Sequence, residues 1–398
     1  MEIFERKLNN MEDIFITDDI LNVGSSDNKQ NLFEGQYVLK NGMGYNSYLI
    51  KDDNNVLIDT VDELVTEKWL NNIEKSLKDE KIDYLIVSHM EPDHAYNIGK
   101  LVNMYPEMKI VGNQTTFNIL LKFFEIDNLD ERKVIVKEGD VLDIGKHKLQ
   151  FFMAPMVHWP EVMVTYEQTE KVLFAADAFG KFGSLGNEDN WIDEARRYYI
   201  GIVGKYGIQV QALLNKVKKL DIKTICSLHG PILNENLSYY IDKYNTWSSY
   251  KPEEEGVYIP CASIHGNSLE AANKMKEILL EKEVKNVQVE DLDRCDWAEA
   301  VANCFKYSHV IFVASSYNTG VFPPMLHLLL HLKDRNYQNR NVGVIENGSW
   351  APSAGKVMKS ILQEMKNINI VDPMITINSR LKDNNIEEMK KLADKLML

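Results

Sequence analysis

Four metal-ligand side chains fall within six residues of this chain, in the segment His89-Met90-Glu91-Pro92-Asp93-His94. An apolar run at residues 84–88 leads into the segment, which predicts a buried strand that ends in a ligand-bearing loop. Loops on a rigid scaffold are where functional residues gather. Two imidazoles and two carboxylates form a mixed nitrogen and oxygen set, which suits iron, manganese or zinc better than copper(I). The chain must therefore fold so that a strand end carries a metal site.

Three further ligand-type residues follow strand-like runs later in the chain: His158, Asp177 and His229. Together with the first four they are too many for one tetrahedral zinc. They suit two metals that share one carboxylate, and Asp177 is the expected bridge. A lone histidine or aspartate at a strand end is usually an ordinary surface or turn residue. The clustered four stand well above that background, whereas the later three need further support.

The bulk composition predicts a two-domain protein. The chain has 398 residues, and the polar, acid-rich segment 248–256 predicts a boundary near residue 250, giving domains 1–250 and 251–398.

A net charge of −14 argues against nucleic-acid binding. The four cysteines include no CxxC pair, so neither a disulfide scaffold nor a cysteine-ligated metal is expected. With no signal peptide and no long apolar run, we expect a cytoplasmic protein without a membrane partner.

Secondary-structure patterns differ on the two sides of this boundary. Before it, strands are expected at 45–50, 56–60, 141–152 and 162–176, and helices at 65–78 and 114–124. That mixture suggests helices packed outside sheets. After it, five strands alternate with helices, which predicts a doubly wound parallel sheet. The strands are expected at 256–262, 286–291, 309–314, 341–346 and 368–376, and the helices at 268–281, 297–304, 324–332, 355–364 and 386–398.

Three polar loops follow the first, third and fourth of these later strands. Such sheets bind ligands at the carboxyl ends of their strands. The first loop precedes a helix and could wrap a phosphate at the helix N-terminus, although small polar residues there are about equally often a simple N-cap. It is neither a dinucleotide fingerprint nor a Walker loop. The loop residues are Ser263, Ile264, His265, Gly266, Asn267 and Ser268, then Ser315, Ser316, Tyr317, Asn318, Thr319 and Gly320, and finally Asn347, Gly348, Ser349, Trp350 and Ala351.

The first cluster resembles the H-x-H-x-D-H motif of the metallo-β-lactamase superfamily, and the later His, Asp and His occur in the superfamily's order. Asp59 matches the early aspartate, which is expected to support a ligand from outside the metal site; as an isolated residue it would read as a turn aspartate. Glu91 replaces the second histidine. The resulting H-x-E-x-D-H resembles the flavodiiron proteins, also called A-type flavoproteins. The added negative charge and hard oxygen donor favour iron.

This resemblance covers nearly the whole chain and sets the expected fold and cofactors. It implies a metallo-β-lactamase-like αββα sandwich followed by a flavodoxin-like, doubly wound, five-stranded parallel sheet. It also implies two non-haem irons bridged by Asp177, FMN held by the three polar loops, and no catalytic residue beyond the iron ligands. Tyr317 and Trp350 are expected beside the isoalloxazine ring rather than in a core. Two features depart from the family's loops. Ser315 stands where family members often have proline, and the stretch from Ala351 to Gly355 also differs.

The implied activity is reduction of O2 to water, of NO to N2O, or of both. O2 reduction takes four electrons, and a diferrous site and a reduced FMN supply two each. Residues 174–180 and 228–232 look most like clostridial members, which favours O2. Near the metals the chain departs from common family residues at Ala95-Tyr96, Glu161-Val162 and Phe182, and in some members the equivalent of His94 is not bound to iron.

The expected partners also come from the resemblance. No rubredoxin or flavin-reductase module follows Leu398, so the minimal two-domain class and a separate donor such as rubredoxin are expected. A head-to-tail homodimer, alone or as a dimer of dimers, would bring one chain's flavin near its partner's irons. Neither the donor's identity nor the proton-delivery route is assigned by the sequence.

Two other functions are compatible with the sequence. One is a zinc hydrolase with an attached flavin-binding regulatory domain, since a fold does not fix a function. Such an enzyme needs a metal-activated water and no electrons, and Glu91 argues against it. The other is an electron carrier that uses FMN alone, which all seven filled ligand positions disfavour. Iron, zinc and flavin content separates the three.

Overall fold

The computed structural model describes residues 14–186 and 190–397 of the chain. These residues form two compact units. The first takes in most of the chain up to Tyr244, and the second runs from Asn245 onward and also takes in Ile200–Gly207. The boundary expected near residue 250 stays a prediction. Each unit is described by itself below.

Two sheets form the centre of the first unit. Within the described residues, one sheet has seven strands in the order β1-β2-β7-β8-β9-β10-β11, and the other has five in the order β12-β13-β14-β15-β16. The first contains β1 (Ile14–Phe15), β2 (Ile20–Asn22), β7 (Tyr48–Ile50), β8 (Val56–Ile58), β9 (Tyr84–Ile86), β10 (Lys109–Gly112) and β11 (Lys133–Ile135). The second contains β12 (Val141–Asp143), β13 (Lys148–Met153), β14 (Met163–Glu167), β15 (Val172–Phe174) and β16 (Thr224–Cys226).

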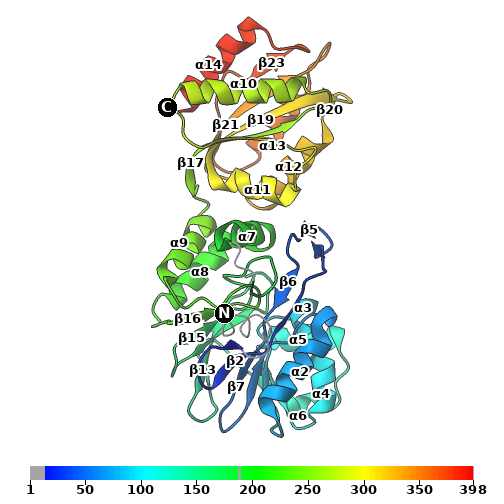
Figure 1. Ribbon diagram of the computed structural model, residues 1–398, viewed down its shortest axis with the longest axis vertical. Helices are drawn as coiled ribbons and strands as arrows, with labels where there is room; N and C mark the ends of the chain where they lie inside the picture. Colours follow the sequence, from blue (N-terminus) through cyan, green and yellow to red (C-terminus); the bar gives the residue numbers. More distant parts are fainter. Residues whose placement is uncertain (1–13, 187–189, 398) are drawn as a thin grey trace, which may run out of the picture. The chain divides into compact units, whose positions relative to one another are not determined.

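Helices flank these sheets. All residues of β7, β8 and β15 are buried, as expected for strands covered on both faces. The helices α2, α4, α5 and α6 gather on one side of the unit, and α8 and α9 on the other (Figure 1). This is the expected αββα sandwich. The helices are α2 (Thr66–Leu77), α3 (Pro92–Ala95), α4 (Ile98–Met104), α5 (Gln114–Phe123), α6 (Leu129–Arg132), α7 (Trp191–Tyr198), α8 (Gly207–Val217) and α9 (Leu237–Ser248).

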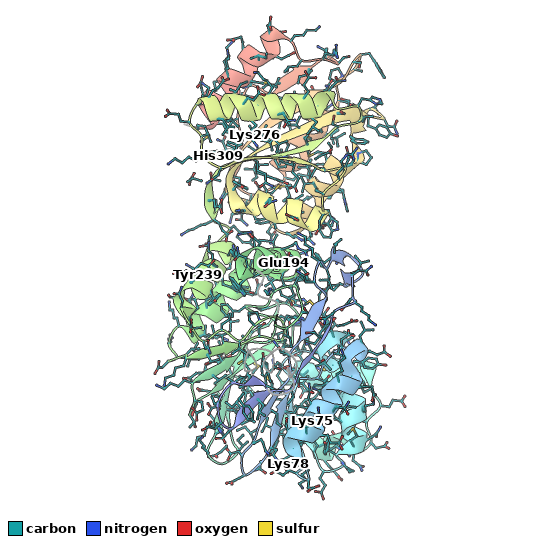
Figure 2. The ribbon with its side chains drawn as sticks, viewed as in Figure 1. Lys75, Lys78, Glu194, Tyr239, Lys276 and His309 are labelled. Carbon is teal, nitrogen blue, oxygen red and sulfur yellow. The ribbon has the colours of Figure 1, made fainter. Side chains whose placement is uncertain are left out.

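Helix α2 illustrates how the sequence sets an element's end. Its buried positions include Trp69, Ile73 and Leu77, four residues apart, so one face packs inward. Lys75 lies in the last turn and Lys78 at the C-cap (Figure 2). Cations there are favoured because the helix dipole leaves partial negative charge at that end.

Two expected strands are in fact hairpins. Residues 141–152 form β12 and most of β13, which pair antiparallel around Gly145. Gly145 has φ +131°, and a Cβ there would lie 2.4 Å from Asp52 Oδ1, so a side chain is excluded. Residues 162–176 likewise split into β14 and β15. Both turns carry a signal in the sequence, Asp143 to Lys148 in the first run and the polar stretch 167–171 in the second, but the apolar residues on either side of each turn predict one continuous strand.

The second unit is a parallel sheet with the order β18-β17-β19-β21-β22 in its described part, the flavodoxin-like arrangement 2-1-3-4-5. Its strands are β17 (Glu254–Ala262), β18 (Val287–Asp291), β19 (Tyr307–Tyr317), β21 (Arg340–Asn347), β22 (Ile368–Ile370) and β23 (Ile375–Ile377). Helices α10 (Asn267–Glu281) and α14 (Asp383–Leu396) cover one face, and α11 (Trp297–Lys306), α12 (Pro323–Asp334) and α13 (Ala354–Gln363) cover the other (Figure 1). The expected fold class is confirmed.

The fifth strand differs from its expectation. Instead of one strand over 368–376, β22 and β23 each pair with β21 on either side of a short break. Pro373 lies in the break and has no N–H to donate to a neighbouring strand. Among the described residues, no helix is long and apolar enough to cross a membrane.

Candidate metal centre and flavin pocket

The motif loop begins where β9 leaves the sheet. Pro92 stands at the first position of the short helix α3, where a missing N–H costs nothing, and Glu91 is its N-cap. Asp59, at φ +54°, anchors the loop because its Oδ1 accepts hydrogen bonds from the backbone N–H groups of Ser88 at 2.7 Å and His89 at 3.2 Å. Asp59 thus holds the backbone that carries the ligands, a more specific role than a turn residue has.

The seven predicted metal ligands converge in two groups: His89, Glu91, His158 and Asp177, and then Asp93, His94 and His229. Within each group the nearest ligand atoms all lie within 4.8 Å of one another. In the first, Glu91 Oε2 lies 3.2 Å from His89 Nε2 and 3.0 Å from His158 Nε2, and the two imidazole nitrogens are 3.3 Å apart. Neighbouring ligands of an ion with bonds of about 2.1 Å stand about 3 Å apart, so this spacing fits one metal.

Asp177 faces both groups. Its Oδ2 lies 3.0 Å from His158 Nε2 and 3.5 Å from His89 Nε2, on the first group's side. Its Oδ1 lies 3.2 Å from His94 Nε2 and 3.9 Å from His229 Nε2, on the second group's side. One carboxylate thus presents one oxygen to each group, which is the geometry of a bridging ligand.

The second group is equally compact. Asp93 Oδ2 lies 3.2 Å from His94 Nε2 and 3.3 Å from His229 Nε2, and the two imidazole nitrogens are 3.1 Å apart. His94 presents Nε2 to the same point as His229 does, so its side chain is positioned to bind. Its other ring nitrogen, Nδ1, is buried and makes no hydrogen bond to the described residues.

Two orienting contacts were not foreseen from the sequence. Glu161 is fully buried, and its Oε1 lies 2.9 Å from His89 Nδ1 and accepts a hydrogen bond from Met90 N at 2.8 Å. The backbone oxygen of Gly44 lies 2.8 Å from His229 Nδ1. An acceptor at Nδ1 fixes the tautomer that leaves Nε2 free for a metal. In the sequence Glu161 stands out only as a departure from family residues, because a glutamate between apolar residues carries no sign of its partner.

The buried carboxylates of the centre favour the binding of cations. Burial raises the pKa of Asp93 to about 7, and the neighbouring Glu91 and Asp177 carboxylates add to the rise. Both Asp93 oxygens and Asp177 Oδ1 are buried without a hydrogen-bond partner among the described residues. Buried carboxylates are costly unless paired or bound to metal. The donor set of imidazole nitrogens and carboxylate oxygens, with no thiolate, fits two iron ions.

An aromatic wall borders the second group. The rings of Phe33, Tyr45 and Tyr198 lie 5.5, 5.6 and 5.5 Å from the His229 ring. Phe182 packs edge-on against Phe33 at 5.7 Å. These rings keep water from the imidazole on that side, so the low-dielectric surroundings strengthen interactions with a bound cation.

A cavity of about 430 Å³ opens at the carboxyl ends of the second unit's strands. It is lined by thirteen of the seventeen predicted flavin contacts: Ile264, His265, Asn267, Ser315, Ser316, Tyr317, Asn318, Thr319, Asn347, Gly348, Ser349, Trp350 and Ala351. Trp350 is 93% exposed, and Tyr317 is 45% exposed. Neither aromatic residue belongs to a core, so both are available to flank a flat ring.

The four remaining predicted residues do not line the cavity, and two of them make hydrogen bonds that hold the loops in place. Ser263 Oγ accepts a hydrogen bond from Leu269 N at 3.3 Å, in the first turn of α10, and Ser268 Oγ lies 2.9 Å from Ser315 Oγ and ties two loops together. Gly266 and Gly320 also lie outside the lining. Ser353 and Ser379 line the cavity but were not predicted, since each lies beyond the three polar loops. Hydroxyls, amides and an exposed aromatic ring fit a flavin mononucleotide.

Comparisons with known proteins place this architecture. Residues 43–230 match the family model described as ODP family beta lactamase. The anaerobic nitric oxide reductase flavorubredoxin of Klebsiella pneumoniae is 26% identical over 363 residues, which cover 88% of this chain and 75% of that protein.

Two solved structures match both units of this chain. The rubredoxin oxygen:oxidoreductase of Desulfovibrio gigas superimposes with a TM-score of 0.89 at 24% identity, covering 96% of this chain and 97% of that one. The flavodiiron protein of Giardia intestinalis gives a TM-score of 0.91 at 21% identity and covers 98% of both chains.

Fold and site together define the class, a metallo-β-lactamase-like domain with a two-metal ligand set followed by a flavodoxin-like domain. That combination is the architecture of the flavodiiron proteins. The chain shares this two-domain fold with the solved flavodiiron structure.

Proposed function

We propose that this protein is an oxidoreductase that reduces O2 to water, NO to N2O, or both, at a di-iron site supplied with electrons by FMN. The observation that carries the proposal is the pair of ligand groups joined by Asp177, with Glu91 in the first group. When bound, the irons and the flavin supply electrons and hold the gas. Zinc hydrolysis needs neither a flavin cavity nor a third carboxylate, so it is the weaker candidate.

The protein's own residues bind, orient and exclude water. His89, His158 and Glu91 would hold one iron, and Asp93, His94 and His229 the other, with Asp177 between them. Glu161 and the Gly44 carbonyl fix two of the imidazoles. In the second unit, the loops after β17, β19 and β21 would hold FMN, with Tyr317 and Trp350 beside the ring.

We propose that O2 is the preferred gas. We also propose that the chain is related to the clostridial members of the family, and this relationship favours O2. One experiment tests function and preference together. Iron, zinc and flavin are measured in the purified protein, and O2 and anaerobic NO consumption are then measured with the same donor. Two irons and one FMN per chain with faster O2 turnover are expected. Two zincs would overturn the proposed function, and NO turnover well above O2 turnover would overturn the preference.

The proposed partners are a rubredoxin-type donor and a second copy of the chain. The Desulfovibrio gigas protein is named for rubredoxin, and the flavorubredoxin carries it in its name. A head-to-tail homodimer, alone or doubled to a tetramer, would serve each di-iron site from the partner's flavin. We propose a cytoplasmic location, where reduced donors are available.

A further inference from the structure

Two histidines on helix α12 face each other from successive turns. His327 and His331 are four residues apart, which places them on the same face of the helix. Their Nε2 atoms lie 2.8 Å apart, and their ring centroids lie 4.3 Å apart. His327 is exposed and His331 is half-buried. Neither histidine lines the flavin cavity, and neither belongs to the two metal groups described above.

The spacing of the two nitrogens matches that of two ligands on one metal ion. Neighbouring ligands of an ion with bonds of about 2.1 Å stand about 3 Å apart. Without an ion, nitrogens this close need one ring to donate an N–H to the other, because two unprotonated nitrogens repel each other. Histidines at positions i and i+4 are also the pair that presents two imidazoles to zinc in helical metal motifs. His327 and His331 therefore have the geometry of a two-histidine metal site.

Neighbouring groups hold one of the two rings in place and keep it uncharged. The Trp297 ring on α11, which lies beside α12 (Figure 1), stacks on the His331 ring with centroids 4.1 Å apart and planes at 13°. Burial, and then the Arg335 and His327 charges, lower the pKa of His331 to about 4, with Asp334 opposing the shift. At neutral pH the His331 ring is therefore in the uncharged form that binds a metal.

Arg335 competes with a metal ion for His331. Its Nη1 donates to His331 Nδ1 at 2.9 Å. This contact favours the tautomer with hydrogen on Nε2, which is the nitrogen that a metal would need. A metal ion must therefore shift that hydrogen to Nδ1 and push the guanidinium away. Ions that bind imidazole well can do so, whereas Mg(II) and Ca(II) prefer oxygen ligands.

We propose that His327 and His331 form an exchangeable site for a divalent, imidazole-binding metal ion such as Zn(II) or Ni(II), separate from the di-iron centre. The two Nε2 atoms would bind the ion. Water would fill the remaining positions, because two protein ligands are fewer than a closed structural zinc site uses. The site goes beyond the proposed gas reduction and does not depend on it.

Three variants test the two ligands and the competitor separately. His327→Gln and His331→Gln each remove one imidazole. Arg335→Glu replaces the competing donor by a carboxylate that can accept a hydrogen bond from Nδ1–H and so leave Nε2 free. His309→Gln, at a half-buried histidine of the same unit, is the control for loss of an imidazole. Lys333→Gln, at an exposed lysine on the same helix, is the control for loss of a positive charge.

Bound Ni(II) is measured by equilibrium dialysis of the full-length protein as purified, and iron and flavin contents are followed in the same samples. We expect one Ni(II) per wild-type chain with no loss of iron. Each of the two glutamine variants at the site should weaken binding more than about tenfold. Arg335→Glu should tighten it about tenfold, because a carboxylate attracts the ion that the guanidinium repels. His309→Gln should match wild type, and Lys333→Gln should differ far less than Arg335→Glu.

X-ray absorption at the nickel edge gives a second readout that identifies the ligands. It should show two imidazole nitrogens on Ni(II) in wild type and one in His331→Gln. The inference is overturned if wild type binds no more Ni(II) than a variant that lacks both histidines, or if iron is lost in step with nickel uptake. Neither measurement involves turnover, so a protein that reduces neither O2 nor NO would overturn the proposed function and leave this site standing.

Discussion

At the residue scale, the candidate metal ligands can be recognised from a short stretch of sequence, but the contacts that orient their side chains cannot. His89, Glu91, Asp93 and His94 are identifiable because four ligand-type side chains within six residues seldom occur together outside a metal site. Glu161 lies 72 positions beyond His89 and acts only through the fold that buries it. The candidate ligands, which the structure gathers in two groups, could be found from the sequence, whereas the contacts that position them could not.

Replacing Glu161 by Gln tests whether the buried carboxylate orients His89. The substitution keeps size but removes the charge that favours the Nδ1–H tautomer, so metal affinity should fall about 10- to 100-fold. Isothermal titration of metal-free protein with Fe(II) under argon measures this. Glu138→Gln, at a surface carboxylate paired with Lys216, should behave as wild type. Unchanged affinity in Glu161→Gln would mean that the Met90 and His89 contacts only stabilise the loop.

Replacing Asp177 by Asn tests the bridge. An asparagine offers one oxygen where the carboxylate offers Oδ1 to one group and Oδ2 to the other. Metal content should drop from two ions per chain to one or fewer, with loss of gas reduction. Metal analysis together with Mössbauer spectra of the iron-loaded protein reports both occupancy and coupling. Asp221→Asn, an exposed surface position paired with Lys171, is the control. Two coupled irons in Asp177→Asn would rule out the bridging role.

At the element scale, strands were easier to place than the turns that divide them. The run 141–152 begins and ends with apolar residues, yet Gly145 reverses it, because only glycine accepts φ +131° beside Asp52. The run 368–376 likewise breaks at Pro373, although its two halves both pair with β21. The parallel sheet was predictable because strict strand and helix alternation permits few other arrangements.

A buried ion pair that includes His147 lies at the start of β13. His147 is fully buried, with Nδ1 3.0 Å from Glu167 Oε1 and Nε2 3.4 Å from Asp19 Oδ2. Burial alone would lower the pKa of His147, but the hydrogen bonds to Glu167 and Asp19, together with the nearby carboxylate charges, outweigh it and raise that pKa above 6.5. Burial alone would raise the pKa of Glu167, but His147 and two backbone N–H groups lower it instead.

These opposite shifts predict a stability window. The His147 contribution is full below its unfolded pKa of about 6.5 and is lost as pH rises through its higher folded pKa. The Glu167 contribution is present above its unfolded pKa of about 4.3 and is lost as pH falls through the lower folded value. His147→Gln should therefore cost about 1–3 kcal/mol near pH 6. Urea unfolding from pH 5 to 9 should show a decline above pH 6.5 in wild type that the variant lacks.

At the scale of the whole molecule, the fold of each unit could be predicted from the sequence, but the way in which the two units' cofactors would exchange electrons could not. One unit carries the metal ligands, and the other carries the flavin cavity with its exposed Trp350. Periodicity, turn signals and motif order fix the two folds because each fold buries its own core. In the proposed head-to-tail dimer, electrons would pass from one chain's flavin to its partner's metals, and no pattern within one chain encodes such an association.

Mixing two inactive variants tests that association. Asp177→Asn should lack the metal bridge but keep its flavin. Gly266→Asp should keep its metals but repel the FMN phosphate at the start of α10, where Gly266 has φ +87° and open space around its missing Cβ. Aspartate tolerates that φ and is a favourable N-cap, so the fold should survive.

In a head-to-tail dimer, flavin and metals act in trans, so a heterodimer of these variants has one working pair of cofactors. Random exchange of subunits makes about half of the dimers mixed, and half of the sites in each are intact, which predicts roughly a quarter of wild-type activity. Each variant alone should be inactive after the same dilution and reassociation. Activity that stays near zero in the mixture, with exchange verified by differently sized tags, would mean that each chain's flavin serves its own metals.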